Sequence, residues 1–138
     1  MEQLITIEQL EELSPEQKDR LRAWWYAINP GRFDLYVVLY KYDDGLKYEG
    51  PFMNTGERDF IEDFYTGEAL PLLSIGQMIQ LIADYAISLG AQWEIKHNWY
   101  KHTVILRSVR NEEILVKVSD AELCNALWHA VKQILQGK

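Results

Sequence analysis

Residues 91–120, AQWEIKHNWYKHTVILRSVRNEEILVKVSD, decide the fold of this chain. Within this stretch, residues 92–97 alternate apolar and polar side chains, residues 103–109 form a second β-rich run, and residues 114–118 form a third. Runs of this kind, separated by only a few residues, predict three neighbouring strands in an antiparallel meander. The connections are too short for the crossovers that parallel strands require.

A second group of strands is predicted upstream. Residues 34–42 carry Val, Leu and Tyr on both faces, which is typical of an inner strand covered on both sides. The turn Asp43-Asp44-Gly45 follows, and residues 46–49 alternate as a returning strand would. Residues 50–73 are irregular, with one or two helical turns expected over 59–65.

Four Ser or Thr residues are each followed three positions later by Gln or Glu, the capping-box pattern of helix N-termini. These pairs are Thr6 with Gln9, Ser14 with Gln17, Ser74 with Gln77, and Ser119 with Glu122. They predict helices over about 7–13, 15–28, 75–89 and 120–136, and the helix after Ser74 is apolar enough to be central to a core. We therefore expect one α+β domain over residues 1–138, with antiparallel sheet, a hairpin plus a three-stranded meander, packed by three to four helices.

Composition excludes several classes of protein. The chain has 138 residues, 48% of them hydrophobic and 25% charged, which favours a globular core over disorder. A single cysteine, Cys124, excludes an intrachain disulfide and a thiolate zinc cluster. There is no basic segment typical of a secretory signal and no apolar run long enough for a bilayer, so we expect a cytoplasmic protein without a membrane partner.

Charge is distributed unevenly along the chain. The formal net charge is −7. Residues 1–70 hold 15 acidic and 7 basic side chains, a net of −8, whereas residues 71–138 hold 6 and 7, a net of +1. The overall acidity disfavours nucleic acid as a general partner, but the two halves of the chain present different electrostatics.

One segment interleaves basic and aromatic residues: Lys96, His97, Trp99, Tyr100, Lys101, His102, Arg107 and Arg110. Aromatic rings beside cations occur in protein-interface hot spots and in contacts with single-stranded nucleic acid. Alternatively, the rings fold back onto the sheet and the cations only protect a strand edge. All three interpretations stay open at this point.

Carboxylates cluster in the irregular segment, at Glu57, Asp59, Glu62, Asp63 and Glu68. Asp59, Glu62 and Asp63 would share one face of a helix, where grouped carboxylates can hold a divalent cation or perform acid/base chemistry. Two other interpretations involve the same carboxylates. They form a solvated helix face, or they form a surface that binds a partner protein by mimicking nucleic acid. We expect no metal and no cofactor here.

The other chemically active side chains are few. A hairpin could bring His97 and His102 together, but no third metal ligand is apparent, so we expect these two to be structural or exposed to solvent. His129 falls on the polar side of its helix, and Cys124 falls on an apolar stripe as a buried residue. Trp24 and Trp25 are expected in the core, although one of them could lie at an interface.

Three helical segments carry a resemblance. They are ITIEQLEELSPEQKDRLRAWW at 5–25, LPLLSIGQMIQLI at 70–82 and ELCNALWHAVKQIL at 122–135. These segments resemble small uncharacterised proteins encoded in phages and prophages of Gram-positive bacteria. The resemblance implies an accessory phage protein that acts in the host cytoplasm, and it implies no catalytic residue.

These observations favour a non-enzymatic accessory protein that binds a protein partner. Its candidate binding residues are Lys96, Trp99, Tyr100, Lys101 and Arg107 on the basic-aromatic segment, and Glu57, Asp59, Glu62 and Asp63 on the acidic one. One alternative is a nucleic-acid-binding protein of phage replication or transcription that uses the basic-aromatic hairpin. Another is a metal-dependent hydrolase that uses Asp59, Glu62 and Asp63.

Overall fold

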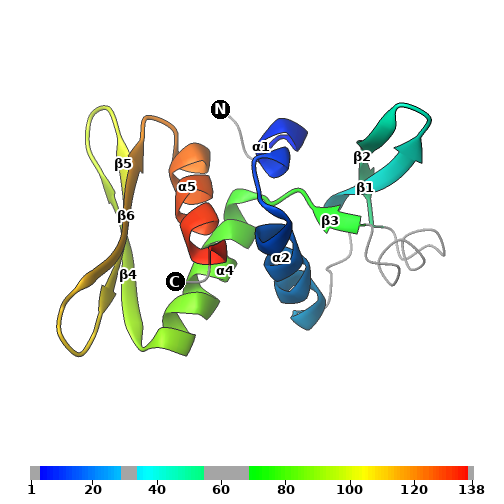
Figure 1. The fold of residues 1–138 in the computed structure, drawn as a ribbon. Helices are drawn as coiled ribbons and strands as arrows, with labels where there is room; N and C mark the ends of the chain where they lie inside the picture. Colours follow the sequence, from blue (N-terminus) through cyan, green and yellow to red (C-terminus); the bar gives the residue numbers. More distant parts are fainter. Residues whose placement is uncertain (1–3, 29–33, 55–68, 137–138) are drawn as a thin grey trace. The chain divides into compact units, whose positions relative to one another are not determined.

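The computed structural model describes residues 4–28, 34–54 and 69–136 (Figure 1). The chain divides into two compact units, one formed by Met1–Ile5 and Leu73–Lys138 (unit 1) and the other by Thr6–Leu72 (unit 2). Each unit combines α-helices with a three-stranded antiparallel sheet, so the predicted α+β fold is confirmed. The prediction of a single domain over residues 1–138 stays a prediction.

Unit 2 begins with two helices, α1 (Ile7–Glu11) and α2 (Pro15–Ala27). Both start with the predicted capping box. The Ser14 hydroxyl accepts a hydrogen bond from the Gln17 amide at 3.1 Å, while the Gln17 side chain accepts one from the Ser14 amide at 2.8 Å. Thr6 and Gln9 make the same reciprocal pair. Each box satisfies two amides that would otherwise have no partner within the helix.

The sheet of unit 2 has the strand order β2-β1-β3, formed by β1 (Leu35–Tyr42), β2 (Gly45–Met53) and β3 (Ala69–Pro71). The predicted hairpin is confirmed, with Tyr42 paired to Gly45. The prediction that this strand is buried on both faces is confirmed for Tyr36–Val38. It is wrong further along β1, where Tyr40 and Tyr42 are each 42% exposed. Strand β3 pairs only with Tyr36–Val38, the part of β1 that is buried.

The core of unit 2 forms around Trp25 and Tyr36. Both residues are buried with Val38 and Ala69, and the centroids of the two rings are 6.4 Å apart. Trp24 is partly buried against the same cluster, so both tryptophans serve the core as predicted. The indole N–H of Trp25 donates to the Asp34 carboxylate at 3.3 Å, which gives this polar atom a partner at the edge of the core.

The first helix of unit 1 is α4 (Ile75–Leu89). The Ser74 and Gln77 capping box opens this helix, and Gly90 closes it in the left-handed conformation, at φ 63°. Glycine adopts this conformation at little cost, which is why it commonly ends helices. The predicted apolar stripe is buried at Met78, Ile82 and Ala86, whereas Leu89 is 48% exposed at the helix end.

The meander predicted from residues 91–120 is confirmed. Strands β4 (Ala91–His97), β5 (His102–Ser108) and β6 (Ile114–Asp120) form an antiparallel sheet in the order β4-β5-β6. The helices α4 and α5 (Leu123–Leu135) pack on one face of this sheet (Figure 1). Val104 and Leu106 of the central strand are fully buried, as are Leu127 and Val131 of α5.

The predicted Ser119 and Glu122 capping box at the start of α5 is wrong. Glu122 is itself the N-cap and makes no side-chain cap hydrogen bond. Ser119 lies in β6, where its hydroxyl is 2.8 Å from that of Thr103 on the neighbouring strand. The carboxylate of Asp120 instead accepts a hydrogen bond from the Glu122 amide at 2.9 Å, so the amide of the N-cap residue has a partner.

Candidate interaction site at the β4–β5 hairpin

The connection between β4 and β5, residues 98–101, is held by the side chain of Asn98. Its amide oxygen accepts hydrogen bonds from the backbone amides of Tyr100 at 3.1 Å and Lys101 at 2.9 Å. The Asn98 amide also donates to the Lys101 carbonyl oxygen at 3.0 Å. An asparagine that bonds its own following backbone fixes a turn locally. The hairpin tip therefore has a defined shape without help from the rest of the unit.

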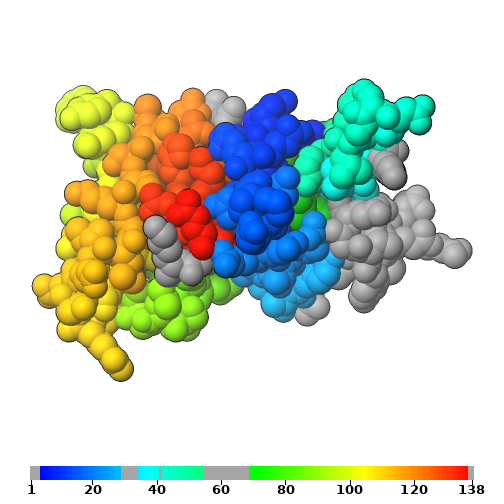
Figure 2. Space-filling model, in the orientation of Figure 1, coloured from blue at the N-terminus to red at the C-terminus, as the bar shows by residue number. Residues whose placement is uncertain are grey.

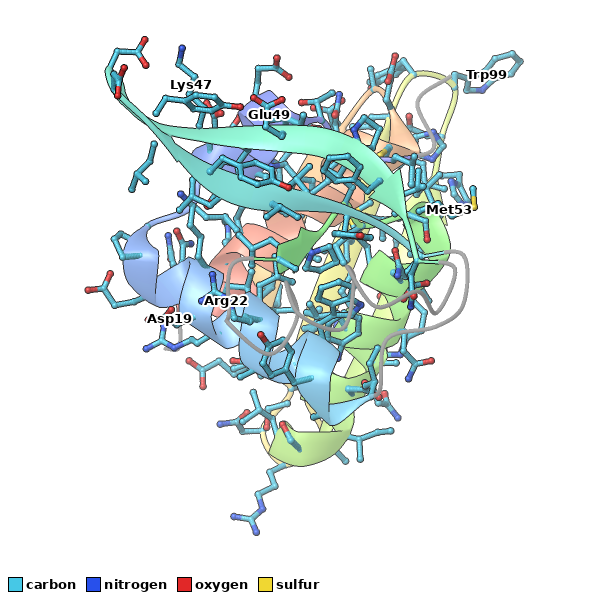
Figure 3. The ribbon with its side chains drawn as sticks, turned by 90° about the vertical axis from the view of Figure 1, so that its right-hand side faces the viewer. Asp19, Arg22, Lys47, Glu49, Met53 and Trp99 are labelled. Carbon is cyan, nitrogen blue, oxygen red and sulfur yellow. The ribbon has the colours of Figure 1, made fainter. Side chains whose placement is uncertain are left out.

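Two aromatic side chains stand on this tip. Trp99 is completely exposed, at 101% relative accessibility, and Tyr100 is 73% exposed. In Figure 3 Trp99 projects beyond the ribbon, and in Figure 2 the yellow-green atoms of this connection protrude at the upper left. The interpretation in which both rings fold back onto the sheet is therefore wrong. A large apolar ring that is wholly in water is a candidate for contact with a partner.

The predicted cations do not all gather at the tip. Lys101 lies in the turn itself, and Lys96 lies one residue before the end of β4. Lys96 Nζ and Arg107 Nε are both 3.8 Å from the same carboxylate oxygen of Glu94. Arg107 pairs with Gln92 near the far end of β4, where it helps to line a surface cavity of about 650 Å³. Glu94 therefore offsets part of the positive charge on this face.

Two histidines form the cross-strand pair next to the turn of this hairpin. His97 and His102 are the last cross-strand pair of β4 and β5, and His102 in turn pairs with Asp120 of β6. Directly opposed residues point to the same face of a sheet. The two Nδ1 atoms are 2.6 Å apart, and the rings meet edge to face with centroids 4.7 Å apart. The predicted approach of these two histidines is confirmed.

The third histidine, His129 of α5, contacts Asp120, the residue opposite His102. His129 Nε2 lies 3.3 Å from the second carboxylate oxygen of Asp120, at partly exposed positions. The hydrogen bond from the Glu122 amide, followed by the hydrogen bond and charge of His129, lowers the pKa of the Asp120 carboxyl. Sequence reasoning missed this contact, because it placed His129 on a polar helix face without a partner. The available signal was Asp120 itself, a side chain able to bond nearby backbone amides three residues before the start of α5.

Several other predicted residues can be placed. Cys124 is buried in α5, at 1% exposure, as predicted. Glu57, Asp59, Glu62 and Asp63, with the helical turn expected around them, lie outside the described residues. Among the residues that are described, no group of three or more His, Cys, Asp or Glu side chains is arranged to hold a metal ion.

The remaining findings concern membrane spans and similarity to known proteins. In the described segments, no helix combines the length and the apolar character needed to cross a membrane. The chain matches no protein-family model, no curated protein sequence and no solved structure.

Proposed function

We propose that this chain is a non-enzymatic binding protein that attaches to a protein partner through Trp99 and Tyr100. The observation that carries the proposal is a fully exposed tryptophan on a turn that is already fixed by Asn98. Tryptophan and tyrosine dominate the energetics of protein interfaces, and an ordered turn loses little further freedom on binding. Phage-type accessory action in a bacterial host cytoplasm, as the resemblance implies, is part of the same proposal.

The expected contribution of Trp99 follows from its exposure. A tryptophan buries about 150–250 Å², which corresponds to roughly 4–6 kcal/mol at about 25 cal/mol per Å². Association costs remove part of this energy. We therefore expect replacement by alanine to cost about 2–4 kcal/mol of binding energy. That loss is a weakening of roughly 30-fold to 1,000-fold, since each 1.4 kcal/mol is about tenfold.

A protein partner is favoured over nucleic acid by the charges around the tip. Glu94 lies within ion-pair distance of both Lys96 and Arg107, two of the cations that phosphate groups would require. The formal charge of −7 opposes phosphate binding in addition. An aromatic anchor with few cations around it suits the core of a protein interface, where charged residues are depleted.

The test is affinity capture from a bacterial host lysate treated with nuclease. The immobilised proteins are the wild type, the Trp99→Ala/Tyr100→Ala double variant, and Val109→Ala as the matched control. Val109 is an exposed apolar residue at 59% accessibility, in the connection at the opposite end of the same sheet. We expect a captured protein to be retained by the wild type and by Val109→Ala and to be lost from the double variant.

Equal capture by the double variant would reject the hairpin as the binding surface. A parallel capture from untreated lysate tests the nucleic-acid alternative. A partner that is retained from the untreated lysate but lost from the nuclease-treated one would favour that alternative. That alternative also predicts that the anisotropy of labelled oligonucleotides rises on addition of the protein, and that their binding weakens steeply as salt is added.

A further inference from the structure

Next to the turn of the β4–β5 hairpin lie two imidazoles whose Nδ1 atoms face one another. The Nδ1 atoms of His97 and His102 are 2.6 Å apart, and the planes of the two rings meet at 83°. In a neutral pair, one Nδ1 donates its proton and the other accepts it with its lone pair. The two Nδ1 atoms therefore face the same point, and in the neutral pair a single proton lies between them.

We propose that His97 and His102 form a two-histidine binding site for a divalent transition-metal cation such as Zn²⁺ or Ni²⁺. Imidazole nitrogen is a preferred ligand for these cations. Metal–nitrogen bonds of about 2.0–2.1 Å at a tetrahedral angle would place the two Nδ1 atoms roughly 3.3 Å apart. The present separation thus has to open by only about 0.7 Å, within reach of a small rotation of either ring.

The strand register keeps both ligands in place for such a cation. His97 and His102 are directly opposed across an antiparallel ladder that continues without a register shift to Ala91 and Ser108. The turn beyond them is closed by the hydrogen bonds of Asn98. Because the backbone already holds the two side chains together, binding one imidazole brings the second to the same metal at high effective concentration.

Charge near the pair is mixed. The Asp120 carboxylate lies opposite His102 and is held by the Glu122 amide and by His129. Lys96 contacts Glu94, and Lys101 lies in the turn. The two histidines supply the protein ligands in this proposal, and water completes the coordination. This composition favours cations that prefer nitrogen over Mg²⁺, which prefers oxygen.

Metal binding also requires a change of proton position. The histidine that donates from Nδ1 must carry its proton on Nε2 instead, so that both Nδ1 lone pairs face the cation. An imidazole that is protonated on both nitrogens has no lone pair for a metal.

The site is independent of the proposed partner binding, because neither imidazole belongs to the aromatic tip. The experiment is calorimetric titration of the full chain with ZnCl₂, compared with MgCl₂. The variants are His97→Ala and His102→Ala, and the matched control is His129→Ala, which removes the only other histidine of the chain. Far-UV circular dichroism checks that each variant is folded.

We expect one Zn²⁺ per chain and no binding of Mg²⁺. His97→Ala and His102→Ala should each weaken Zn²⁺ binding by at least about tenfold, given that even losses of outer-shell groups cost about 10–100-fold. His129→Ala should change it by less than about threefold. In ring ¹⁵N spectra of the wild type, the Nδ1 resonances of both hairpin histidines should shift on addition of Zn²⁺.

Two results would overturn the proposal. One is a wild type that binds Zn²⁺ no more tightly than the His97→Ala/His102→Ala double variant. The other is binding that depends on His129 while either hairpin histidine can be removed without effect, since the metal would then lie elsewhere.

Discussion

Replacement of Asp120 by alanine should destabilise unit 1, because this carboxylate joins the end of β6 to the start of α5. The contacts that are lost include a backbone hydrogen bond and an ion pair. The hydrogen bond from the Glu122 amide, at 2.9 Å, should contribute about 1 kcal/mol, as an intramolecular hydrogen bond typically does. The contact with His129, at 3.3 Å between partly exposed groups, adds about 0.2–1 kcal/mol. We expect the free energy of unfolding to fall by about 1–2 kcal/mol in total.

The effect of Asp120→Ala should depend on pH in a defined direction. The pKa of the Asp120 carboxyl is lowered in the folded protein from its ordinary value of 3.8. A lowered pKa stabilises the fold fully above that ordinary value, and this stabilisation is lost as the pH falls through the folded value. The difference between wild type and variant should therefore be complete at neutral pH and should shrink in acid.

Urea-induced unfolding at pH 7 and at about pH 2 measures both effects. Asp120→Asn is the informative companion, because it keeps an oxygen acceptor for the Glu122 amide and removes only the charge. A double-mutant cycle with His129→Ala isolates the contribution of the ion pair. The reasoning fails if Asp120→Ala leaves stability unchanged at neutral pH, or if its cost in acid equals its cost at pH 7.

Three other changes test the fold and the exposure of the tip by the same unfolding measurements. Gly50→Ala should destabilise unit 2 by about 1–3 kcal/mol, because Gly50 has φ 136° and an added Cβ would lie 3.0 Å from the Tyr36 carbonyl oxygen; an unchanged midpoint would contradict this. Ser74→Ala should cost about 1 kcal/mol by removing the cap of α4, whereas Ser74→Asp should restore most of it; equal loss in both would contradict the capping role. Trp99→Ala should change stability by less than about 0.5 kcal/mol, since the ring is fully exposed; a larger loss would show that it packs on the protein.

Local signals in the sequence predicted local structure well. The boxes at Thr6, Ser14 and Ser74 are confirmed, because each depends on four consecutive residues and on nothing else. The box at Ser119 has the same spacing but is wrong. Its hydroxyl is engaged by Thr103, 16 residues away in sequence, and that contact exists only once β5 and β6 pair.

Pairings between distant segments were harder to predict. Strand β3 has only three residues and ends in Pro71, so it carries no alternating pattern. It nevertheless pairs with Tyr36–Val38 of β1, the central strand of the sheet. Because this strand forms only against β1, its existence depends on tertiary contacts and not on local propensity. The glycines and prolines of residues 50–73 predict an irregular segment, and this is wrong at its two ends, where β2 continues to Met53 and β3 spans Ala69–Pro71.

The candidate site was predicted in part. Hairpin spacing alone indicated that His97 and His102 would meet, and the structure places their nitrogens in contact. Whether Trp99 folds back or faces water depends on the conformation of a four-residue turn, which composition does not encode. The same limit applies to Arg107, which shares the segment with the tip but lies well along β5 from it.

The single thiol of the chain belongs to unit 1 and can serve as a chemical probe of that unit. Cys124 is 1% exposed on α5, which belongs to unit 1, and unit 2 contains no cysteine. A thiol-specific reagent can therefore modify the protein only when unit 1 opens around α5. The rate of this reaction, followed across increasing denaturant, would report the exposure of Cys124 on α5.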